Sequence, residues 1–475
     1  MSKILMVASE ATPFAKTGGL ADVLGALPRA LAARGEEVAV VLPHYRHVEG
    51  AQRAFDGLRI YSSTADIWLL IRDGVRFYFV DCPPLFHRAG IYMEAGKDYP
   101  DNHIRFGVLC QGAIAVARWL FQPEIIHYHD WQGSLVAPLI RTALAGDPTF
   151  FGVQLLLTIH NLGYQGHFPR QALTEAGLGA DLFRPGIMEF YGGVNLLKGG
   201  IVFADAINTV SKGYAREIQT PEYGFGLDGL LRSRSDVLSG IINGVDYTEW
   251  NPEHDPFIAA HFSSRQFAGK QACKRDLLEA LGLPLDNMTR PLIGIVSRFA
   301  GQKGFDLIES AARELMKENL CLAVLGTGEQ RYEELFRTLG AAFPDRVGVR
   351  IEYNEVLAHK IEAGADMFLM PSRYEPCGLN QIYSLRYGTV PIVRATGGLD
   401  DTIRQDTGFK FQEYSGFALL EAVRAALAAF ADPGVWKQMM RNGMAQDYSW
   451  DASAVEYSAL YERLRAESFS PVRSS

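Results

Sequence analysis

The chain has 475 residues, a length that exceeds one ordinary hydrophobic core and predicts two or three domains. Hydrophobic residues make up 48% of the sequence, and 46 basic against 54 acidic residues give a formal net charge of -8. Because the basic residues form no tail or run, we expect no nucleic-acid partner.

The cysteines point to a reducing compartment. Cys82, Cys110, Cys273, Cys321 and Cys377 are odd in number and show no CxxC spacing, which favours reduced thiols over disulfides or zinc ligation. The apolar stretch before Ser9 is too short for a signal-peptide core, and no run approaches the length of a membrane span. We therefore expect a cytoplasmic protein without a membrane partner.

Short apolar runs alternate with helical patterns in the first half of the chain, up to about residue 241. This alternation predicts parallel strands and the doubly wound α/β fold class. The expected strands are residues 3–8, 37–42, 124–127, 154–159, 206–210 and 239–242. Two further runs, 67–72 and 75–81, are joined by Asp73-Gly74, a dipeptide typical of tight hairpin turns, and we expect an insertion at a sheet edge.

A second series of strands follows a polar, proline-punctuated linker at about residues 252–290. Its expected strands are residues 291–296, 321–325, 347–351, 367–370 and 390–393. The two series predict two Rossmann-like, doubly wound domains, 1–241 and 242–449, with the carboxyl ends of their strands facing each other across a cleft. The last stretch, 450–475, is expected to be an amphipathic helix over most of its length.

A strand-loop-helix turn at residues 371–384 (PSRYEPCGLNQIYS) is the strongest candidate for a ligand site. Glu375 and the amides of Gly378 and Leu379 fall where the strand gives way to a helix expected over 381–387. A helix start offers unpaired N–H groups and a positive dipole end to a phosphate, and glycine removes the Cβ that would hold a ligand away. The turn therefore predicts a nucleotide-sugar site.

A similar arrangement follows the first strand. Gly18 and Gly19 open the next helix, and Lys16 stands two residues before them, where it is able to reach an anion at the helix start. The alternatives are a plain surface lysine at 16 and, one turn into the helix, an Asp22 that only caps or solvates it. TGGL recurs from Thr396, and two such phosphate cradles in two halves imply one ligand between them.

Six motifs carry a resemblance to a known family. KTGGLADV, HDWQG, TIHNLGYQG, INGVDYTEWNP, SRFAGQKGFDL and PSRYEPCGLNQIY occur in the order found in bacterial glycogen synthases and plant starch synthases. The chain resembles this family over nearly its whole length. The resemblance implies a retaining glucosyltransferase of the GT-B fold, which moves glucose from ADP-glucose to the non-reducing end of an α-1,4-glucan such as glycogen. It also implies that the first domain carries the acceptor side and part of the donor site, the second binds the nucleotide sugar, and the last helix crosses back onto the first.

Arg298 and Lys303 are candidate catalytic cations. They lie at the end of an expected strand and at the start of the helix beginning near Gly304, where both are able to converge on one pyrophosphate. Structural ion pairing is the ordinary alternative. A guanidinium fork suits bidentate phosphate contact, whereas an ammonium is a compact charge that follows charge as it develops. We expect the two to stabilise the ADP leaving group.

Glu375 and His160 are the other two candidate catalytic residues. A carboxylate after a strand is usually a helix cap or a surface ion pair, and a lone histidine there is more often structural. In the family, the glutamate matching Glu375 contacts the transferred glucose near the reacting carbon, so the resemblance implies that role. Asn161 and the glycines after His160 make an open polar loop suited to sugar hydroxyls.

The HYHDW segment superficially resembles a metal site, because residues two apart share one face of a strand. His127, His129 and Asp130 lack further ligands at usable spacing, so we expect no metal there. We interpret Asp130 and Trp131 instead as lining the acceptor groove, with the indole stacked on a sugar face.

The remaining candidates are assigned to substrate binding. The resemblance implies that Lys16 binds the donor. We expect Asn243 to contact the donor glucose, and Tyr353 either to stack on adenine or to be a core tyrosine. Cys377, which lies between Glu375 and the phosphate cradle, and Thr396 complete the set. Asn380 stands where the family usually has threonine.

Retaining transfer normally uses a carboxylate nucleophile paired with an acid/base group. Because the family pattern places no convincing nucleophile on the reactive face, we favour a front-side displacement in which the leaving phosphate takes the acceptor proton. We expect no cofactor and no metal requirement. Two rival functions remain open: a glucan phosphorylase-like enzyme, which needs a pyridoxal-binding lysine, and a non-catalytic glucan-binding protein.

Overall fold

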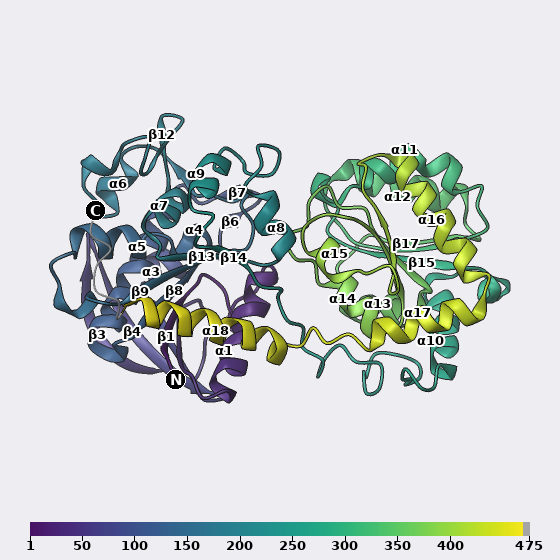
Figure 1. Ribbon diagram of the computed structural model, residues 1–475, viewed down its shortest axis with the longest axis horizontal. Helices are drawn as coiled ribbons and strands as arrows, with labels where there is room; N and C mark the ends of the chain where they lie inside the picture. Colours follow the sequence, from purple (N-terminus) through teal and green to yellow (C-terminus); the bar gives the residue numbers. More distant parts are fainter. Residues whose placement is uncertain (469–475) are drawn as a thin grey trace. The chain divides into compact units, whose positions relative to one another are not determined.

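The computed structural model describes residues 1–468, and the chain folds as two compact units (Figure 1). Unit 1 comprises Met1–Val210, Ala215–Gly244 and the described residues from Trp450 onward. Unit 2 comprises Ser211–Tyr214 and Val245–Ser449. The main passage of the chain from unit 1 to unit 2 follows Gly244, whereas the sequence predicted a domain boundary after residue 241. The expected last stretch, 450–475, is described as far as residue 468, and its residues 469–475 lie outside the described part.

Unit 1 is built on a nine-stranded sheet in the order β14-β13-β9-β8-β1-β2-β5-β4-β3. The seven strands from β14 to β5 are parallel to one another, and their mostly apolar sequences suit burial on both faces. Their bounds are β1 Lys3–Val7, β2 Glu37–Pro43, β5 Val75–Asp81, β8 Ile125–His129, β9 Gln154–Ile159, β13 Ala206–Thr209 and β14 Leu238–Gly240. This parallel core confirms the predicted α/β class.

The hairpin at Asp73-Gly74 is present but is not an insertion as a whole. It joins β4 (Ser63–Arg72) to β5 in an antiparallel pair. β5 also pairs in parallel with β2, so it belongs to the main sheet. Only β4 and its antiparallel neighbour β3 (Gln52–Ile60) extend the edge. The sequence could not separate these cases, because an apolar run does not show which strand lies beside it.

Helix α18 (Trp450–Ser468) packs on α1 (Gly19–Ala33) in unit 1, where it is drawn in yellow in Figure 1. Its buried side chains recur at helical spacing and join the core that covers β1 and β2. They are Trp450, Ala454, Tyr457, Leu460, Tyr461 and Leu464. The end of the chain thus completes the core around its first strand.

Residues 102–121 correct the expectation that no run reaches the length of a membrane span. By length and composition this helical stretch, which begins with α3 (Asn102–Val116), is able to cross a membrane. Most of it is buried inside the protein, including the charged side chain of Arg105, which donates hydrogen bonds to the backbone oxygens of Leu85 and Ile91. We therefore assign it as a core helix of unit 1.

The other helices of unit 1 are short, and a small separate sheet lies beside them in sequence. The helices are α2 Pro83–Phe86, α4 Asp130–Gly133, α5 Val136–Pro138, α6 Ala172–Glu175, α7 Leu196–Phe203 and α9 Asp228–Ser233. α8 (Lys212–Glu217) contains residues of both units. The small sheet has the order β10-β12-β11, with bounds His167–Phe168, Gly193–Asn195 and Glu189–Phe190.

Unit 2 is a six-stranded parallel sheet in the order β17-β16-β15-β18-β19-β20. The strands are β15 Leu292–Val296, β16 Cys321–Leu325, β17 Val347–Arg350, β18 Met367–Met370, β19 Val390–Arg394 and β20 Phe409–Phe411. The helices are α10 Ala268–Leu281, α11 Phe305–Leu315, α12 Gln330–Ala342, α13 Glu355–Gly364, α14 Asn380–Arg386, α15 Gly397–Thr402, α16 Gly416–Phe430 and α17 Pro433–Met444.

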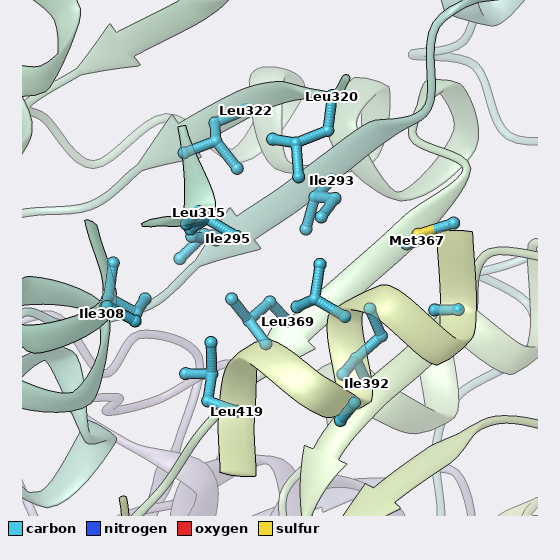
Figure 2. Close-up of a cluster of buried hydrophobic side chains, with 14 of the residues drawn as sticks. Ile293, Ile295, Ile308, Leu315, Leu320, Leu322, Met367, Leu369, Ile392 and Leu419 are labelled. Atoms are coloured by element: carbon cyan, nitrogen blue, oxygen red, sulfur yellow. The ribbon is translucent and has the colours of Figure 1, made fainter. Parts of the chain in front are cut away.

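Apolar side chains from neighbouring strands of unit 2 meet those of the helices on one sheet face (Figure 2). Ile293, Ile295, Met367, Leu369 and Ile392 come from the strands, and Ile308, Leu315 and Leu419 come from α11 and α16. Each of these side chains is at most 2% exposed. This core fixes the strand ends from which the loops of the candidate site emerge.

Candidate active site

Lys303 and Glu375 are brought together by the topology of unit 2. β15 and β18 are parallel neighbours, so the loops that follow them leave the same edge of the sheet. The loops are tied to each other: the amide of Arg373 donates to the oxygen of Gln302 at 2.8 Å, and Gln302 Nε2 donates to the oxygen of Tyr374 at 3.2 Å.

Gly304 allows this close approach. Its φ of +74° lies in the left-handed region, and a Cβ there would lie 1.9 Å from the backbone oxygen of Pro371. No side chain is tolerated at that distance, so glycine keeps the loop of Lys303 against the end of β18.

The ammonium of Lys303 lies 2.7 Å from Glu375 Oε2, and Ser372 Oγ donates to the same oxygen at 3.0 Å. Glu375 is only 5% exposed, so this is a shielded, charge-assisted contact. Lys303 therefore forms an ion pair, but its partner is another candidate site residue. Arg298 is exposed and forms no ion pair with any residue in the described 1–468.

The turn after Glu375 has the geometry expected of a phosphate cradle. Gly378 has φ +71°, and α14 begins at Asn380, one residue earlier than predicted. Within residues 1–468 the amides of Gly378 and Leu379 donate to no other residue. Asn380 Nδ2 donates to the oxygen of Val296 at 2.8 Å, which ties the helix start to β15. The atypical asparagine thus has a structural contact.

The second TGGL segment contacts the Glu375 loop of the protein itself. The amide of Gly398 donates to the backbone oxygen of Glu375 at 3.0 Å, and a Cβ at Gly398 would lie 2.1 Å from the oxygen of Cys377. Thr396 is buried before α15. The segment therefore packs against the backbone of the Glu375 loop. Because its Gly398 amide donates to that loop, this amide is not part of a second phosphate cradle.

Two other candidates of unit 2 differ in exposure. Tyr353 is 84% exposed, which excludes the core-tyrosine alternative; adenine stacking stays a prediction. Cys377 is 5% exposed, and all five cysteines are buried, with no disulfide in the described part of the chain.

In unit 1, Glu10 contacts the residues just before α1, and the sequence did not predict this contact. Glu10 is 3% exposed, and its carboxylate accepts hydrogen bonds from the amide and hydroxyl of Thr17, from the amide of Gly18 at 3.3 Å and from the hydroxyl of Tyr92. The Gly18 amide expected to bind phosphate is therefore engaged by a protein carboxylate. Thr17 and Gly18 are only 7 and 8 residues from Glu10, whereas Tyr92 is 82 residues away and no local signal marks that contact.

In the same loop, Lys16, Gly18 and Gly19 are exposed. Lys16 Nζ lies 2.7 Å from Asp22 Oδ1, so Asp22 orients the lysine instead of only solvating the helix. A Cβ at Gly18 or Gly19 would meet no atom within 4 Å. Packing therefore does not demand glycine at either position, and close approach of a ligand to the backbone is the remaining reason for it.

His160 and Asp130 lie together at the carboxyl ends of β8 and β9, which are parallel neighbours. The His160 amide donates to Asp130 Oδ1 at 2.7 Å, and His160 Nε2 lies 3.0 Å from His129 Nδ1. Burial lowers the pKa of His160 to about 3 and raises that of Asp130 to about 7, the latter against the opposing effect of two backbone N–H groups. His160 is therefore neutral at physiological pH and suited to hydrogen bonding with hydroxyls.

The metal alternative for HYHDW is excluded at His127. This side chain is fully buried, and its two ring nitrogens contact Tyr461 OH at 2.8 Å and Thr158 Oγ1 at 2.7 Å. With both nitrogens occupied, His127 has no position left for a metal ion.

The stacking role expected of Trp131 is wrong for this structure. The indole is 8% exposed, meets the ring of Phe106 edge-on at 5.1 Å and lies 5.6 Å from the ring of Phe168. A Cβ on Gly166 would lie 2.6 Å from the indole. The ring thus has no open face for a sugar, because a nonlocal aromatic cluster covers it.

Asn161 and Asn243 have different surroundings. Asn161 Oδ1 accepts from the amide of Gly163 at 3.0 Å, which shapes the loop. Asn243 is 7% exposed, and its Oδ1 has no hydrogen-bond partner among residues 1–468. A buried carbonyl of this kind is suited to accept from a sugar hydroxyl.

Comparisons with known proteins agree with these two α/β units. Residues 3–233 match the family model described as starch synthase catalytic domain, and residues 284–438 match the one described as glycosyl transferases group 1. The fold and the matches define a glycosyltransferase enzyme of the GT-B class, as predicted.

Similar proteins narrow the family further. The glycogen synthase of Koribacter versatilis is 53% identical over 97% of this chain and 98% of its own length. That of Anaeromyxobacter dehalogenans is 48% identical over 97% of this chain and 99% of its own. The chain belongs to the glycogen synthase family.

Two solved structures resemble the chain. The catalytic domain of starch synthase IV from Arabidopsis thaliana, bound to ADP and acarbose, has a TM-score of 0.86 and 32% identity, over 98% of this chain and 99% of that one. Sucrose-phosphate synthase from Thermosynechococcus elongatus, with a TM-score of 0.60 and 20% identity over 98% of this chain and 100% of that one, shares the fold.

Proposed function

We propose that this protein transfers glucose from ADP-glucose to the non-reducing end of an α-1,4-glucan such as glycogen, with retention at the anomeric carbon and release of ADP. The observation that carries the proposal is the shielded Lys303–Glu375 pair at the strand ends of unit 2. The names of the curated relatives and the ADP and acarbose bound to the starch synthase support the choice of donor and acceptor. We further propose a cytoplasmic location.

Different residues of unit 2 bind different parts of the donor. Lys303, Arg298 and the amides of Gly378 and Leu379 bind the two phosphates, and Tyr353 stacks on adenine. Glu375 accepts hydrogen bonds from the transferred glucose through the oxygen that Lys303 does not occupy.

The residues of unit 1 act on the phosphates and sugars through hydrogen bonds and one charge. Lys16, oriented by Asp22, contacts the donor phosphate beside the open backbone of Gly18 and Gly19. His160 and Asn243 contact sugar hydroxyls, and Asp130 and Asn161 shape the loop that holds His160.

The chemical step is a front-side displacement. The bond between the anomeric carbon and the phosphate oxygen breaks, the acceptor hydroxyl forms the new bond on the same face, and its proton passes to the leaving phosphate. Lys303 and Ser372 both donate hydrogen bonds to Glu375 Oε2. These contacts stabilise the negative charge of the carboxylate and make it a weak nucleophile. Catalysis then rests on stabilising the negative charge that grows on the phosphate.

We propose that this step needs no divalent metal, because Lys303, Arg298 and Lys16 supply the positive charge that the pyrophosphate requires. Turnover should persist in EDTA. Loss of activity in EDTA that magnesium or manganese restores would contradict this proposal.

A donor assay on glycogen tests the function. We expect elongation of the glucan with ADP-glucose, at a higher kcat/KM than with UDP-glucose. Turnover with glucose 1-phosphate in place of ADP-glucose would support the phosphorylase-like alternative. Binding of glycogen with no turnover of any donor would support a glucan-binding protein.

A further inference from the structure

Two histidines and an aspartate outside the candidate active site meet at one end of the unit 1 sheet. His44 follows β2 directly, and Asp81 is the last residue of β5. Because β2 and β5 are parallel and Pro43 lies opposite Val80, the next residues of both strands come side by side. His87 follows the short helix α2 and completes the group.

Three ligand-type atoms converge there. Asp81 Oδ1 lies 3.4 Å from His44 Nδ1 and 3.2 Å from His87 Nε2, and all three atoms lie within 4.8 Å of one another. Each atom is shielded from solvent, and although both histidines lie within ion-pair distance of Asp81, none of the three atoms forms a hydrogen bond with the described residues. Buried polar atoms without partners are rare, and three that face one another call for a physical reason.

The spacing of these atoms suits a shared metal ion. Zinc lies about 2.0–2.2 Å from imidazole nitrogen and carboxylate oxygen in tetrahedral sites, which puts neighbouring ligand atoms roughly 3.3–3.6 Å apart. A direct charge-assisted hydrogen bond between imidazolium and carboxylate is shorter, about 2.7–2.9 Å. The two observed distances, 3.2 and 3.4 Å, lie near the metal-site range.

The surroundings also hold the ligands in place. Trp68 Nε1 donates to the other carboxylate oxygen, Asp81 Oδ2, at 3.2 Å, which leaves Oδ1 for a metal. The Trp68 indole stacks on His44 with ring centroids 5.6 Å apart and planes 17° apart. Such outer contacts orient metal ligands and tune their affinity. The side chain of His87 is 32% exposed and offers a route for an ion to enter.

We propose that His44, Asp81 and His87 bind one divalent transition-metal ion, with zinc as the best match, in a site separate from the glucosyl-transfer residues. Two imidazoles and one carboxylate are typical zinc ligands, and three protein ligands leave a position for water. The ion ties the ends of β2 and β5 together. Tyr45, next to His44, donates to the backbone oxygen of Ser9 at 2.9 Å, so the site also braces the loop that carries Glu10.

The test measures zinc content and thermal stability of the full-length protein. We expect the parent, after zinc loading and dialysis, to hold about one equivalent more zinc than His87→Ala. Saturating zinc should raise the Tm of the parent but not that of His87→Ala, because an ion that binds only the folded state stabilises it. His47→Ala, which removes an exposed histidine outside the cluster, is the matched control and should behave as the parent.

A second variant tests the proposal if His87→Ala fails to fold. Trp68→Phe keeps the three ligands and removes only the donor to Asp81, and it should lower zinc affinity about 10–100-fold. Cobalt in place of zinc should give the parent the intense visible absorption of a four-coordinate site. Equal zinc content in the parent and His87→Ala would overturn the proposal, as would an absence of zinc-dependent stabilisation in the parent.

The comparison of variants also separates this site from another group. Glu249, Glu355 and His359 of unit 2 have ligand atoms within 4.8 Å of one another, but two of the three are exposed. Zinc bound there would remain in His87→Ala, so the difference between the two proteins reports the unit 1 site alone.

Discussion

Lys303 Nζ lies 2.7 Å from Glu375 Oε2, so a cation expected to act on the leaving phosphate and a carboxylate expected to act on the glucose form one ion pair. Each group therefore sets the charge that the other presents to the donor. This coupling governs how single and double variants of the two residues should behave.

Glu375→Gln should reduce transfer at least 100-fold, roughly the cost of removing one preorganised group from a reacting centre. ADP should bind as tightly as before or more tightly, because a negative charge next to Lys303 is removed. Steady-state kinetics and calorimetric titration with ADP measure the two effects. Glu413→Gln, at an exposed position, is the control, and near-normal turnover of Glu375→Gln would refute the assigned role.

Lys303→Ala should lower kcat about 10²–10³-fold, or about 3 kcal/mol in the barrier, with a smaller effect on donor KM. The ammonium interacts most strongly with the charge that develops in the transition state. Lys303→Arg should recover only part of the loss, because the planar fork occupies a different position. An alanine variant with raised KM and unchanged kcat would show that Lys303 only binds donor. Lys317→Ala, in an exposed pair with Glu314, is the control.

The double variant Lys303→Ala/Glu375→Gln should lose less than the product of the two single losses. Once the lysine is absent, the carboxylate has lost its partner and removing its charge costs less. We expect a coupling energy of about 1–3 kcal/mol from the double-mutant cycle. Strict additivity in kcat/KM would mean that the ion pair has no part in the reaction.

Two glycines should respond oppositely to alanine. Gly18→Ala should leave Tm nearly unchanged, because its Cβ points into open space, but raise donor KM by blocking the approach to the backbone. Gly304→Ala should lower the free energy of unfolding by roughly 2–4 kcal/mol, from positive φ and the contact with Pro371. Thermal melts and donor kinetics on both variants check this. A Gly18→Ala protein that binds donor normally would remove Gly18 from the site.

Buried histidines should make the protein sensitive to mild acid. Burial lowers the pKa of His127 and His160 to about 3, and that of His129 well below its ordinary value. Between about pH 3 and 6.5 the unfolded chain binds protons that these rings exclude, so the free energy of unfolding falls as the pH falls. Asp130 and Glu362 act in the opposite direction, because burial raises their pKa values to about 7 and about 8 and makes the folded state bind an extra proton at each, but three rings outweigh two carboxyls.

His127→Gln tests this account. It should reduce the pH dependence of the unfolding free energy by about 1.4 kcal/mol per pH unit between about pH 4 and 6, which corresponds to one proton. Urea denaturation at about pH 4.5, 5.5 and 6.5 measures the slope. His47→Gln, at an exposed position, should leave the slope unchanged. An unaltered slope in His127→Gln would show that this ring is not the source of the acid sensitivity.

The sequence predicted what depends on local order. Apolar runs located most of the parallel strands, and the turn from Glu375 to Leu379 was placed correctly at the end of β18 because strand, loop and helix are contiguous there.

Contacts between distant segments could not be predicted. The Glu10 carboxylate accepts from Tyr92, and Trp131 packs against Phe106 and Phe168. In each case the partner lies tens of residues away and no pattern along the chain links the two. Parallel strand neighbours such as β2 and β5, which bring His44 to Asp81, are set by the sheet order in the same way.

The packing of α18 has a consequence for how the protein is made. Tyr461 contacts His127 across 334 residues, and the same helix supplies Trp450 and Tyr457 to the core around β1. Unit 2 is complete once residue 449 has left the ribosome, whereas unit 1 still lacks part of its core. During synthesis, the half of the protein that is begun first is therefore finished last, and a nascent chain truncated before α18 would expose the apolar face of α1 to chaperones and proteases.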